Sequence, residues 1–309
     1  MKKIVYSIVV AAIGLTACKK NDPIPGPTPD AADLINFISG NVSDKIQNFT
    51  VSANSPIYIV GNEGVILSLP ANQLEDAGGT LISGNVDIEL IEITKKSAML
   101  LLDKPTRGKM ANGDHELLIS RGEYYVTIKQ FGTEVVLISP MHVTAPAAFD
   151  GTMRKFVDVG TGDELLWDMA DDSIIVADST GSGFDILPDE WGWTNIDRFY
   201  SDPRPKTTIF ADLPDGFDNT NTEVYLSYDG EGPALANFDK WDSNQNMFTE
   251  HYGLIPIGLD VHFIAIAIVD DDLHYCIESV SITDNHVQDI SDFAVTTEAQ
   301  LINLIDNLP

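Results

Sequence analysis

The amino-acid sequence predicts a mainly β protein made of two β-sandwich domains, with a short helix at the C-terminus. Short segments rich in β-branched and aromatic residues recur between glycine-containing turns, a spacing typical of sandwiches and barrels. In one segment Val86, Ile88 and Leu90 alternate with Asp87 and Glu89, as expected for a strand with one buried and one solvated face. Near the end of the chain the apolar residues change to helical spacing.

The first residues have the pattern of an export signal. Met1-Lys2-Lys3 is basic, and the apolar run from Ile4 to Ala17 is shorter than the roughly 20 residues that a membrane-spanning helix needs. The run ends in Leu15-Thr16-Ala17-Cys18, which resembles the lipobox of bacterial lipoproteins. This resemblance implies that residues 1–17 form a signal peptide and that Cys18 receives diacylglycerol and palmitate. The alternative is an ordinary secretory signal followed by an unrelated cysteine.

Residues 18–33 are predicted to be a tether. Four prolines lie between Pro23 and Pro29, and this composition favours an extended spacer over a folded element. No second apolar stretch reaches membrane-spanning length, since Val261 to Val269 has the length of a strand. The Cys18 lipid is therefore the expected membrane attachment. The short charged stretch directly after the cysteine is similar to that of Gram-negative lipoproteins sent to the outer face of the outer membrane, which implies an outer-membrane, surface-exposed location.

The composition restricts the partners. Asp and Glu number 47 and Lys and Arg 18, which gives a net charge of −29. A field this negative repels nucleic acid and anionic lipid, so no nucleic-acid partner is expected. It is compatible with bound divalent cations, although a solvated acidic surface is the simpler interpretation. With Cys18 lipidated, Cys276 has no disulfide partner, and its apolar segment predicts a buried, unreactive thiol.

Residues 34–150 are predicted to form the first sandwich. Its expected strands are separated by turns that contain glycine or asparagine. These strands are Phe49–Ala53, Ile57–Val60, Val65–Leu69, Val86–Ile93, Glu116–Ser120, Tyr124–Gln130 and Glu134–Ile138.

This region resembles a known β-domain. The block from Gly64 to Asn72, followed by Gly79 and by the stretch from Gly84 to Glu92, is similar to the core of ZU5-like domains. With Lys96–Leu101 and Gly122–Tyr125 included, the region also resembles uncharacterised bacterial surface lipoproteins that carry a ZU5-like domain followed by an immunoglobulin-like domain. The resemblance implies a fold and no activity.

Some ZU5 proteins cleave themselves at a His-Phe-Ser site. In this chain His262-Phe263-Ile264 lacks the serine and lies far downstream of the region that carries the resemblance. Self-cleavage is therefore not expected.

Residues 151–296 are predicted to form the second, immunoglobulin-like sandwich, after a turn-rich junction near residues 150–165. Asp270-Asp271-Asp272 is expected to be a hairpin turn. In the amphipathic helix expected at residues 297–309, Thr297 and Gln300 have the positions of a capping box. The expected strands are Thr207–Phe210, Glu223–Tyr228, Val261–Val269 and Leu273–Thr283.

The string Trp191–Tyr200 is the most distinctive candidate for a binding site, and a similar string occurs in the lipoproteins that the chain resembles. Its indoles could stack on a sugar or a peptide, while its amide, carboxylate and guanidinium groups would supply directed hydrogen bonds. The alternative is an aromatic edge of the core with local polar contacts, which is the more frequent use of such residues. The candidate ligand-binding residues are Trp191, Trp193, Asn195, Asp197 and Arg198.

Two loops are rich in oxygen-bearing side chains. One contains Asp212, Asp215 and Asp218, and the other begins at Asp242. Because calcium takes about six to eight oxygen ligands, the first three residues are candidate calcium ligands. Neither loop has the spacing of an EF-hand, since Met247 occupies the place of its glycine. An acidic turn without a metal is the alternative, and no other cofactor is expected.

The sequence contains no catalytic signature. His115-Glu116 begins like a zinc-protease motif, but Ile119 replaces the second histidine. Neither a nucleophile elbow nor a phosphate-binding loop is present. The sequence therefore favours a non-enzymatic surface binding or structural module with a protein or glycan ligand. The alternative is a glycan-acting enzyme, or an accessory subunit of a polysaccharide-processing complex, which would need two carboxylates about 5–10 Å apart in a cleft.

Overall fold

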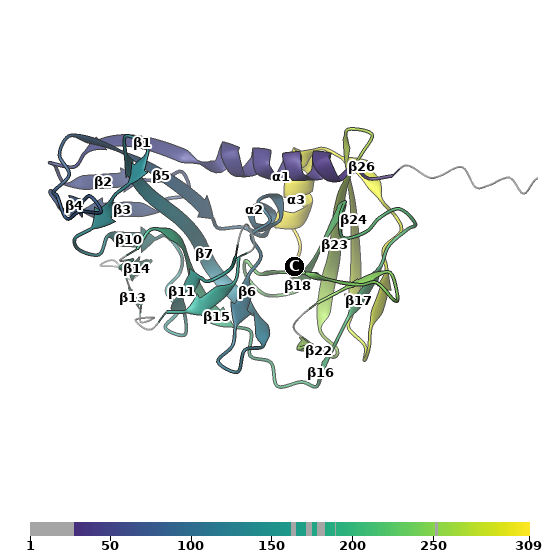
Figure 1. Ribbon diagram of the computed structural model, residues 1–309. Coiled ribbons are helices and arrows are strands. Elements are labelled where there is room, and N and C mark those ends of the chain that lie inside the picture. Colours follow the sequence, from purple (N-terminus) through teal and green to yellow (C-terminus); the bar gives the residue numbers. More distant parts are fainter. Residues whose placement is uncertain (1–27, 162–164, 171–174, 178–182, 189, 251–252) are drawn as a thin grey trace, which may run out of the picture.

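The computed structural model describes residues 28–161, 165–170, 175–177, 183–188, 190–250 and 253–309. Strands make up 46% and helices 11% of these residues, which confirms the mainly β prediction. Figure 1 shows two β-rich halves that are connected by helices. The predicted signal peptide, Cys18 and residues 18–27 of the tether lie outside the described residues.

The first half contains an eight-stranded sheet. Its strands are β1 Gln47–Ser52, β5 Asn85–Ile93, β6 Arg107–Lys109, β7 His115–Gln130, β8 Thr133–Glu134, β11 Arg154–Asp158, β12 Trp167–Met169 and β15 Gly192–Phe199. Their order is β1-β5-β7-β15-β11-β12-β6, and β8 also pairs with β7. Because β6 pairs with β7 as well as with β12, the strands β7, β15, β11, β12 and β6 form a closed ring.

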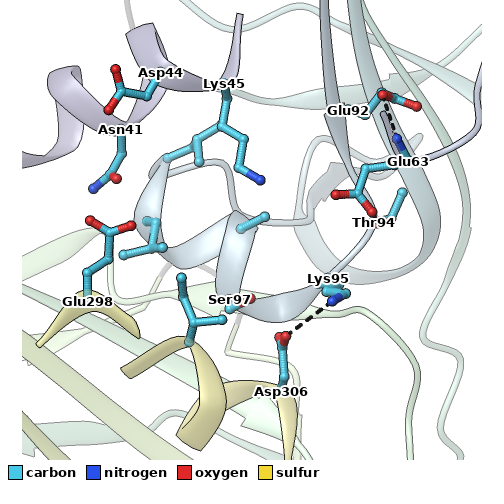
Figure 2. Close-up of a pocket in the computed structure, with 14 residues that line it drawn as sticks. Asn41, Asp44, Lys45, Glu63, Glu92, Thr94, Lys95, Ser97, Glu298 and Asp306 are labelled. Atoms are coloured by element: carbon cyan, nitrogen blue, oxygen red, sulfur yellow. Dashed lines mark hydrogen bonds and ion pairs between the residues drawn. The ribbon is translucent and has the colours of Figure 1, made fainter. Parts of the chain in front are cut away.

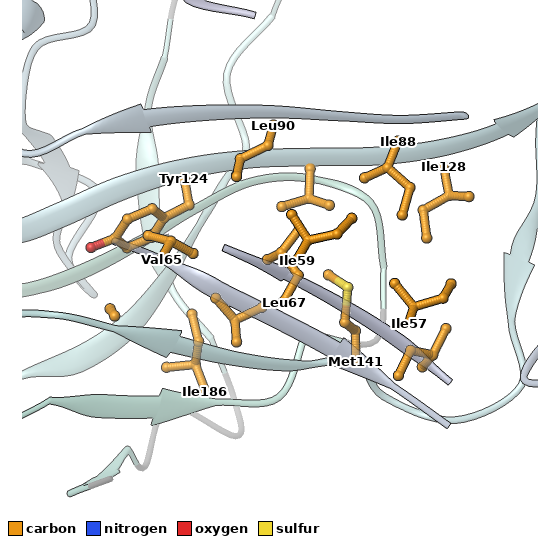
Figure 3. Packing of buried hydrophobic residues seen from close by; sticks show 14 of the residues in the cluster. Ile57, Ile59, Val65, Leu67, Ile88, Leu90, Tyr124, Ile128, Met141 and Ile186 are labelled. Carbon is orange, nitrogen blue, oxygen red and sulfur yellow. The ribbon is translucent and has the colours of Figure 1, made fainter. Parts of the chain in front are cut away.

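A second sheet packs on one face of this sheet. Its strands are β2 Ile57–Val60, β3 Ile66–Leu69, β10 His142–Ala145, β13 Val176–Ala177 and β14 Phe184–Ile186, in the order β13-β14-β10-β3-β2. Figure 3 shows the core between the sheets, where Ile57, Ile59 and Leu67 face Ile88 and Leu90 of β5. The predicted alternation along β5 is confirmed by its burial. The strands β4 Leu74–Glu75 and β9 Val136–Leu137 form a separate pair.

The second half is another pair of packed sheets with its own core. Its strands are β16 Lys206–Thr207, β17 Phe210–Asp212, β18 Thr222–Tyr228, β19 Leu235–Asn237, β20 Lys240–Asp242, β21 Met247–Thr249, β22 Ile255–Pro256, β23 Asp260–Val269, β24 Asp272–Ser281, β25 Val287–Asp289 and β26 Ala294–Thr296. The sheets have the orders β19-β18-β23-β24-β26 and β20-β21-β17-β25, and β16 pairs with β22. The predicted hairpin turn is confirmed, since Asp270 and Asp271 have φ angles of 52° and 67° between β23 and β24.

The strands on both sides of residue 150 belong to the same half. β11 and β15 follow this position in the sequence, but they pair with each other and β15 pairs with β7. The boundary expected at residue 150 therefore falls inside the stretch of chain that builds the first sheet, which extends to Phe199. Such long-range pairing leaves no mark on the local residue pattern from which the boundary was predicted.

Three helices of the described chain connect the halves: α1 Ala31–Lys45, α2 Lys96–Leu101 and α3 Glu298–Asp306. Figure 1 shows α1 extending along both halves, with α2 and α3 between them. All six residues of α2 are buried. Their apolar side chains share one core with Ile93 of β5, Ile264 of β23 and Leu301 of α3. Because this core draws on both halves, we expect the halves to unfold together.

The C-terminal helix is confirmed, because Thr297 and Gln300 form a capping box and Leu301 and Ile305 are buried. The helices α1 and α2 differ from the sequence-based prediction. α1 begins inside the expected tether. Its Leu34 is buried, and Phe37, Ile38 and Val42 pack at helical spacing against the core around α2. α2 is buried on every side, which removes the periodicity that identifies a surface helix. No helix in the described part of the chain is both long and apolar enough to cross a bilayer.

Glu92 of β5 holds the turn that precedes β3. Its buried carboxylate accepts hydrogen bonds from the backbone N–H groups of Glu63 and Val65, each at 2.9 Å, and from Gln47 Nε2 at 2.8 Å. We predict that Glu92→Ala lowers the free energy of unfolding by about 3 kcal/mol, because these partners lose a buried charged acceptor. Urea denaturation measures this change.

Glu89→Ala is the matched control for this prediction. Glu89 lies on the same strand but forms a partly exposed ion pair with Lys129 at 2.8 Å. Because exposed pairs contribute little, its loss should cost less than about 1 kcal/mol. Equal losses in the two variants would contradict the role given to Glu92.

Candidate functional site

Most of the Trp191–Tyr200 string, Gly192–Phe199, forms β15, which lies between β7 and β11. Its pairing with β7 is irregular, because Asn195 lies opposite Glu123 whereas Asp197 lies opposite Ser120. In this stretch β7 has one residue more than β15, which defines a β-bulge.

Gly122 makes this bulge possible. Its φ angle is 137°, and a Cβ atom at this position would collide with the hydroxyl group of Tyr124. Only glycine combines this backbone conformation with such a close approach. The bulge then determines which side chains of β7 and β15 meet.

Four polar side chains meet at the bulge, and all four are fully buried: Ser120, Glu123, Asn195 and Asp197. Ser120 Oγ donates to Asn195 Oδ1 and accepts from the Gly122 N–H, each at 2.9 Å. Asn195 Nδ2 donates to Asp197 Oδ2 at 2.6 Å and to Glu123 Oε1 at 3.5 Å. Glu123 Oε2 and Asp197 Oδ1 have no hydrogen-bond partner among the described residues. We call these four residues the bulge cluster.

Burial raises the pKa of both carboxyl groups of the bulge cluster well above the usual range. The charge of Asp197 raises the pKa of Glu123 further, while Lys104 lowers it. The hydrogen bond from Ser120 and the charge of Arg121 lower the pKa of Asp197, but by less than burial raises it. The cluster therefore binds protons more tightly than exposed carboxyl groups do.

The bulge cluster faces the inside of the ring of strands. Asn195 and Asp197 project to the same face of β15 as Trp193 and Phe199, which pack against Phe156 and its neighbours inside the ring. None of the four cluster side chains has exposed surface. Asn195 and Asp197, predicted as ligand-binding residues, are thus placed out of reach of a ligand in this conformation.

Trp191 and Trp193 lie at the beginning of β15, where both line a crevice of about 380 Å³. Gly192, with a φ angle of 119°, lies between them. Trp191 packs on the core of the first sandwich and donates from Nε1 to the carbonyl of Val135. Trp193 packs beside Tyr125, with ring centroids 5.4 Å apart. Both indoles are therefore held by the fold while part of each borders the crevice.

Polar residues that the sequence did not identify complete the crevice: Lys155, Asp158 and Glu190. Asp158 Oδ1 accepts from the N–H groups of Gly160 at 2.8 Å and Leu166 at 3.1 Å, which fixes its carboxylate. Lys155 is buried and Glu190 is exposed. The first two residues reach this place because β11 pairs with β15, a contact that no local pattern in the sequence reveals.

Arg198 lies at the other end of β15. Its Nη2 is 3.5 Å from Glu231 Oε2, in the connection between β18 and β19. The five residues predicted as one patch are thus divided among the crevice, the bulge cluster and this ion pair. The division follows from strand geometry, since residues four apart on a strand are roughly 13 Å apart.

The candidate calcium ligands are dispersed or engaged. Asp218 Oδ1 accepts from both the N–H and the hydroxyl of Thr220, at 2.8 Å and 2.6 Å. Asp212 ends β17, and Asp215 is exposed. In the other loop, a hydrogen bond from Gln245 and the N–H of Asn244 lower the pKa of Asp242. The described residues contain no group of three or more His, Cys, Asp or Glu side chains arranged to hold a metal ion.

Cys276 of β24 is buried and carries a free thiol, as predicted. Burial, together with the nearby charge of Glu278, raises its pKa to about 11. A thiol with such a high pKa is a poor nucleophile at neutral pH.

A separate cavity between the halves, of about 230 Å³, lies where the three helices meet β5 (Figure 2). Figure 2 shows Lys45 directed into it from α1, with the Lys95–Asp306 ion pair, 3.5 Å long, on the opposite side. Glu92, which also borders this cavity, already serves the fold by holding its turn. The cavity carries no aromatic residue among its described lining, so the tryptophan crevice is the better candidate site.

No protein-family model matches the chain, and a search of curated proteins finds no similar sequence. The likeness to ZU5-like and immunoglobulin-like domains therefore stays a prediction.

The bulge cluster predicts how stability depends on pH. The folded-state pKa values of Glu123 and Asp197 lie above the roughly 4 of the unfolded chain. Their contribution is thus complete below about pH 4 and is lost as the pH rises through the folded-state values. Combining Glu123→Gln with Asp197→Asn should remove up to about 1.4 kcal/mol per pH unit for each carboxyl group from this slope. Urea denaturation across a pH series measures it.

Asp215→Asn serves as the control, because Asp215 is exposed. This variant should keep the pH slope of the wild type. If the double variant also keeps the slope, the two buried carboxyl groups do not bind protons more tightly in the folded state.

Proposed function

We propose that the chain is a membrane-tethered lipoprotein whose folded body is a non-enzymatic binding module. The observation that carries the proposal is the crevice, where Trp191 and Trp193 converge with Lys155, Asp158 and Glu190. Apolar and aromatic walls with a few directed polar groups are typical of ligand sites. The ZU5-like and immunoglobulin-like assignments belong to the same proposal and are supported by the two pairs of packed sheets.

The preorganisation of the crevice supports a binding role. A hydrogen bond to the carbonyl of Val135 fixes Trp191, and packing on Tyr125 fixes Trp193. Two backbone N–H groups donate to Asp158 and fix its carboxylate. Side chains that are already ordered lose little conformational entropy when a ligand binds.

The burial of the carboxyl groups of the bulge cluster favours binding over catalysis. Glu123 and Asp197, which share Asn195 as a hydrogen-bond donor, are sealed from solvent. In the crevice, Asp158 Oδ1 accepts hydrogen bonds from two backbone N–H groups, which fix this carboxylate as an ordered acceptor for a ligand. A glycosidase needs two accessible carboxyl groups on either side of the scissile bond.

The proposed anchor rests on the sequence before Thr28. The signal pattern of residues 1–17, Cys18 and the proline-rich spacer support attachment to the outer membrane through lipid. Just before α1, the chain is held against the second half, because the Asp30 N–H donates to the carbonyl of Ile268 at 2.8 Å. The charge of −29 keeps the body away from anionic headgroups, as a spacer-mounted module requires.

The anchor is tested by Cys18→Ala. Without an acyl chain the protein loses about 0.8 kcal/mol of membrane affinity for each buried methylene group. We expect the variant in the soluble fraction and the wild type in the membrane fraction, as measured by fractionation and immunoblotting. Cys276→Ala is the matched control and should stay with the membrane. Retention of Cys18→Ala in the membrane would refute the anchor.

The binding role is tested with immobilised oligosaccharide and peptide arrays. The full-length protein should bind at least one class of probe. Trp193→Ala should weaken this binding at least about tenfold and also lower the melting temperature, because Trp193 packs on Tyr125. Glu190→Ala should weaken binding at an unchanged melting temperature, because Glu190 is exposed.

Trp241→Ala controls for the loss of a half-buried indole. Trp241 packs on Phe248 in the second half, so this variant should lose stability and keep binding. An absence of binding to both arrays, or an equal loss in Trp241→Ala, would contradict the proposal. Cleavage of a bound glycan, detected by mass spectrometry, would replace it with the alternative of a glycan-acting enzyme.

A further inference from the structure

The tryptophan crevice, here called the first cavity, lies beside a second cavity. This second cavity, of about 330 Å³, is lined by His142, Ile175, Val176, Asp185, Ile186 and Leu187 together with Lys155. Lys155 also lines the first cavity, so the two are adjacent around one side chain. Indoles line the first cavity, and aliphatic residues form most of the lining of the second.

The walls of both cavities expose aliphatic side chains. Val159 in the first cavity is 42% exposed, and Val176 and Leu187 in the second are 57% and 52% exposed. The packing of the fold leaves these groups in contact with water. A group of exposed apolar residues that lines a cavity marks a contact surface.

Each cavity also holds a carboxylate in a fixed orientation. In the second, Asp185 Oδ1 accepts from Thr144 Oγ1 at 2.7 Å, and Asp185 Oδ2 lies 3.3 Å from His142 Nε2. In the first, Asp158 is held by backbone N–H groups. The two cavities thus repeat one combination, an apolar wall beside an ordered hydrogen-bond acceptor.

From this repetition we infer that the crevice binds a neutral oligosaccharide that spans both cavities and therefore at least two sugar units. The inference rests on the binding function proposed above and adds the class of ligand. A pyranose ring has an apolar C–H face that stacks on indole or aliphatic groups, and hydroxyl groups at its edge that donate to carboxylates. Each cavity therefore suits one part of a sugar chain.

Other ligand classes fit the crevice less well. Asp158, Asp185 and Glu190 outnumber Lys155 among its described lining residues, so an acidic oligosaccharide would be repelled. A lipid chain would place these carboxylates against hydrocarbon and offer them no hydrogen-bond donor of its own. A peptide is the remaining class, and the experiment distinguishes it.

The test is isothermal titration of the full-length protein with neutral gluco-, manno- and galacto-oligosaccharides of one to six units. We expect at least one series to bind with a Kd that decreases about tenfold or more between one unit and four units. Val176→Ala and Leu187→Ala should weaken the longer ligands several-fold and leave the monosaccharide unchanged, because they alter only the second cavity. Ile35→Ala, which removes an exposed aliphatic group from α1, should have no effect.

The outcomes separate this inference from the proposed function. A Kd that does not depend on length, or one that Val176→Ala and Leu187→Ala leave unchanged, would overturn the two-cavity site. Binding of peptides or acidic oligosaccharides without neutral ones would overturn the ligand class and leave the binding module standing. No binding of any probe would overturn both.

Discussion

The strand β7 is the constraint on which the rest of the structure depends, because its side chains enter every core of the described chain. Val126 packs in the first sandwich, Leu117 in the second, Leu118 inside the ring of strands, and Tyr125 against the core around α2. A regular strand has only two faces. The bulge at Gly122, which changes the pairing between β7 and β15, allows one strand to serve four cores by bending between its two halves.

This constraint explains why the most distinctive string in the sequence divides. β15 pairs along both halves of β7, so its middle, Asn195 and Asp197, is carried into the interior at the bulge. Its beginning, with Trp191 and Trp193, emerges at the crevice. The polar residues that the sequence suggests as ligand contacts instead hold the bulge together, and the cost of burying their carboxyl groups appears as raised pKa values.

Features that depend on a few neighbouring residues could be predicted from the sequence, whereas pairing between distant strands could not. The alternation along β5, the turn at Asp270 and Asp271, and the capping box of Thr297 each depend on a few neighbouring residues, and the structure confirms them. The closed ring, the extension of the first sheet to Phe199 and the burial of α2 depend on contacts between distant segments. The two indoles of the crevice lie in one local string and could be proposed from the sequence. Lys155 could not, because it reaches the crevice only through the pairing of β11 with β15.

The proposed ligand site is the crevice beside Trp191 and Trp193. The chain has four tryptophans. The other two serve as internal controls, because Trp167 is fully buried inside the ring and Trp241 lies in the second half. The most direct measurement is the indole N–H spectrum of the ¹⁵N-labelled full-length protein during titration with a neutral oligosaccharide. We expect the signals of Trp191 and Trp193 to shift while those of Trp167 and Trp241 stay in place. Shifts confined to Trp241, or no shift at any indole despite binding, would contradict the proposed site.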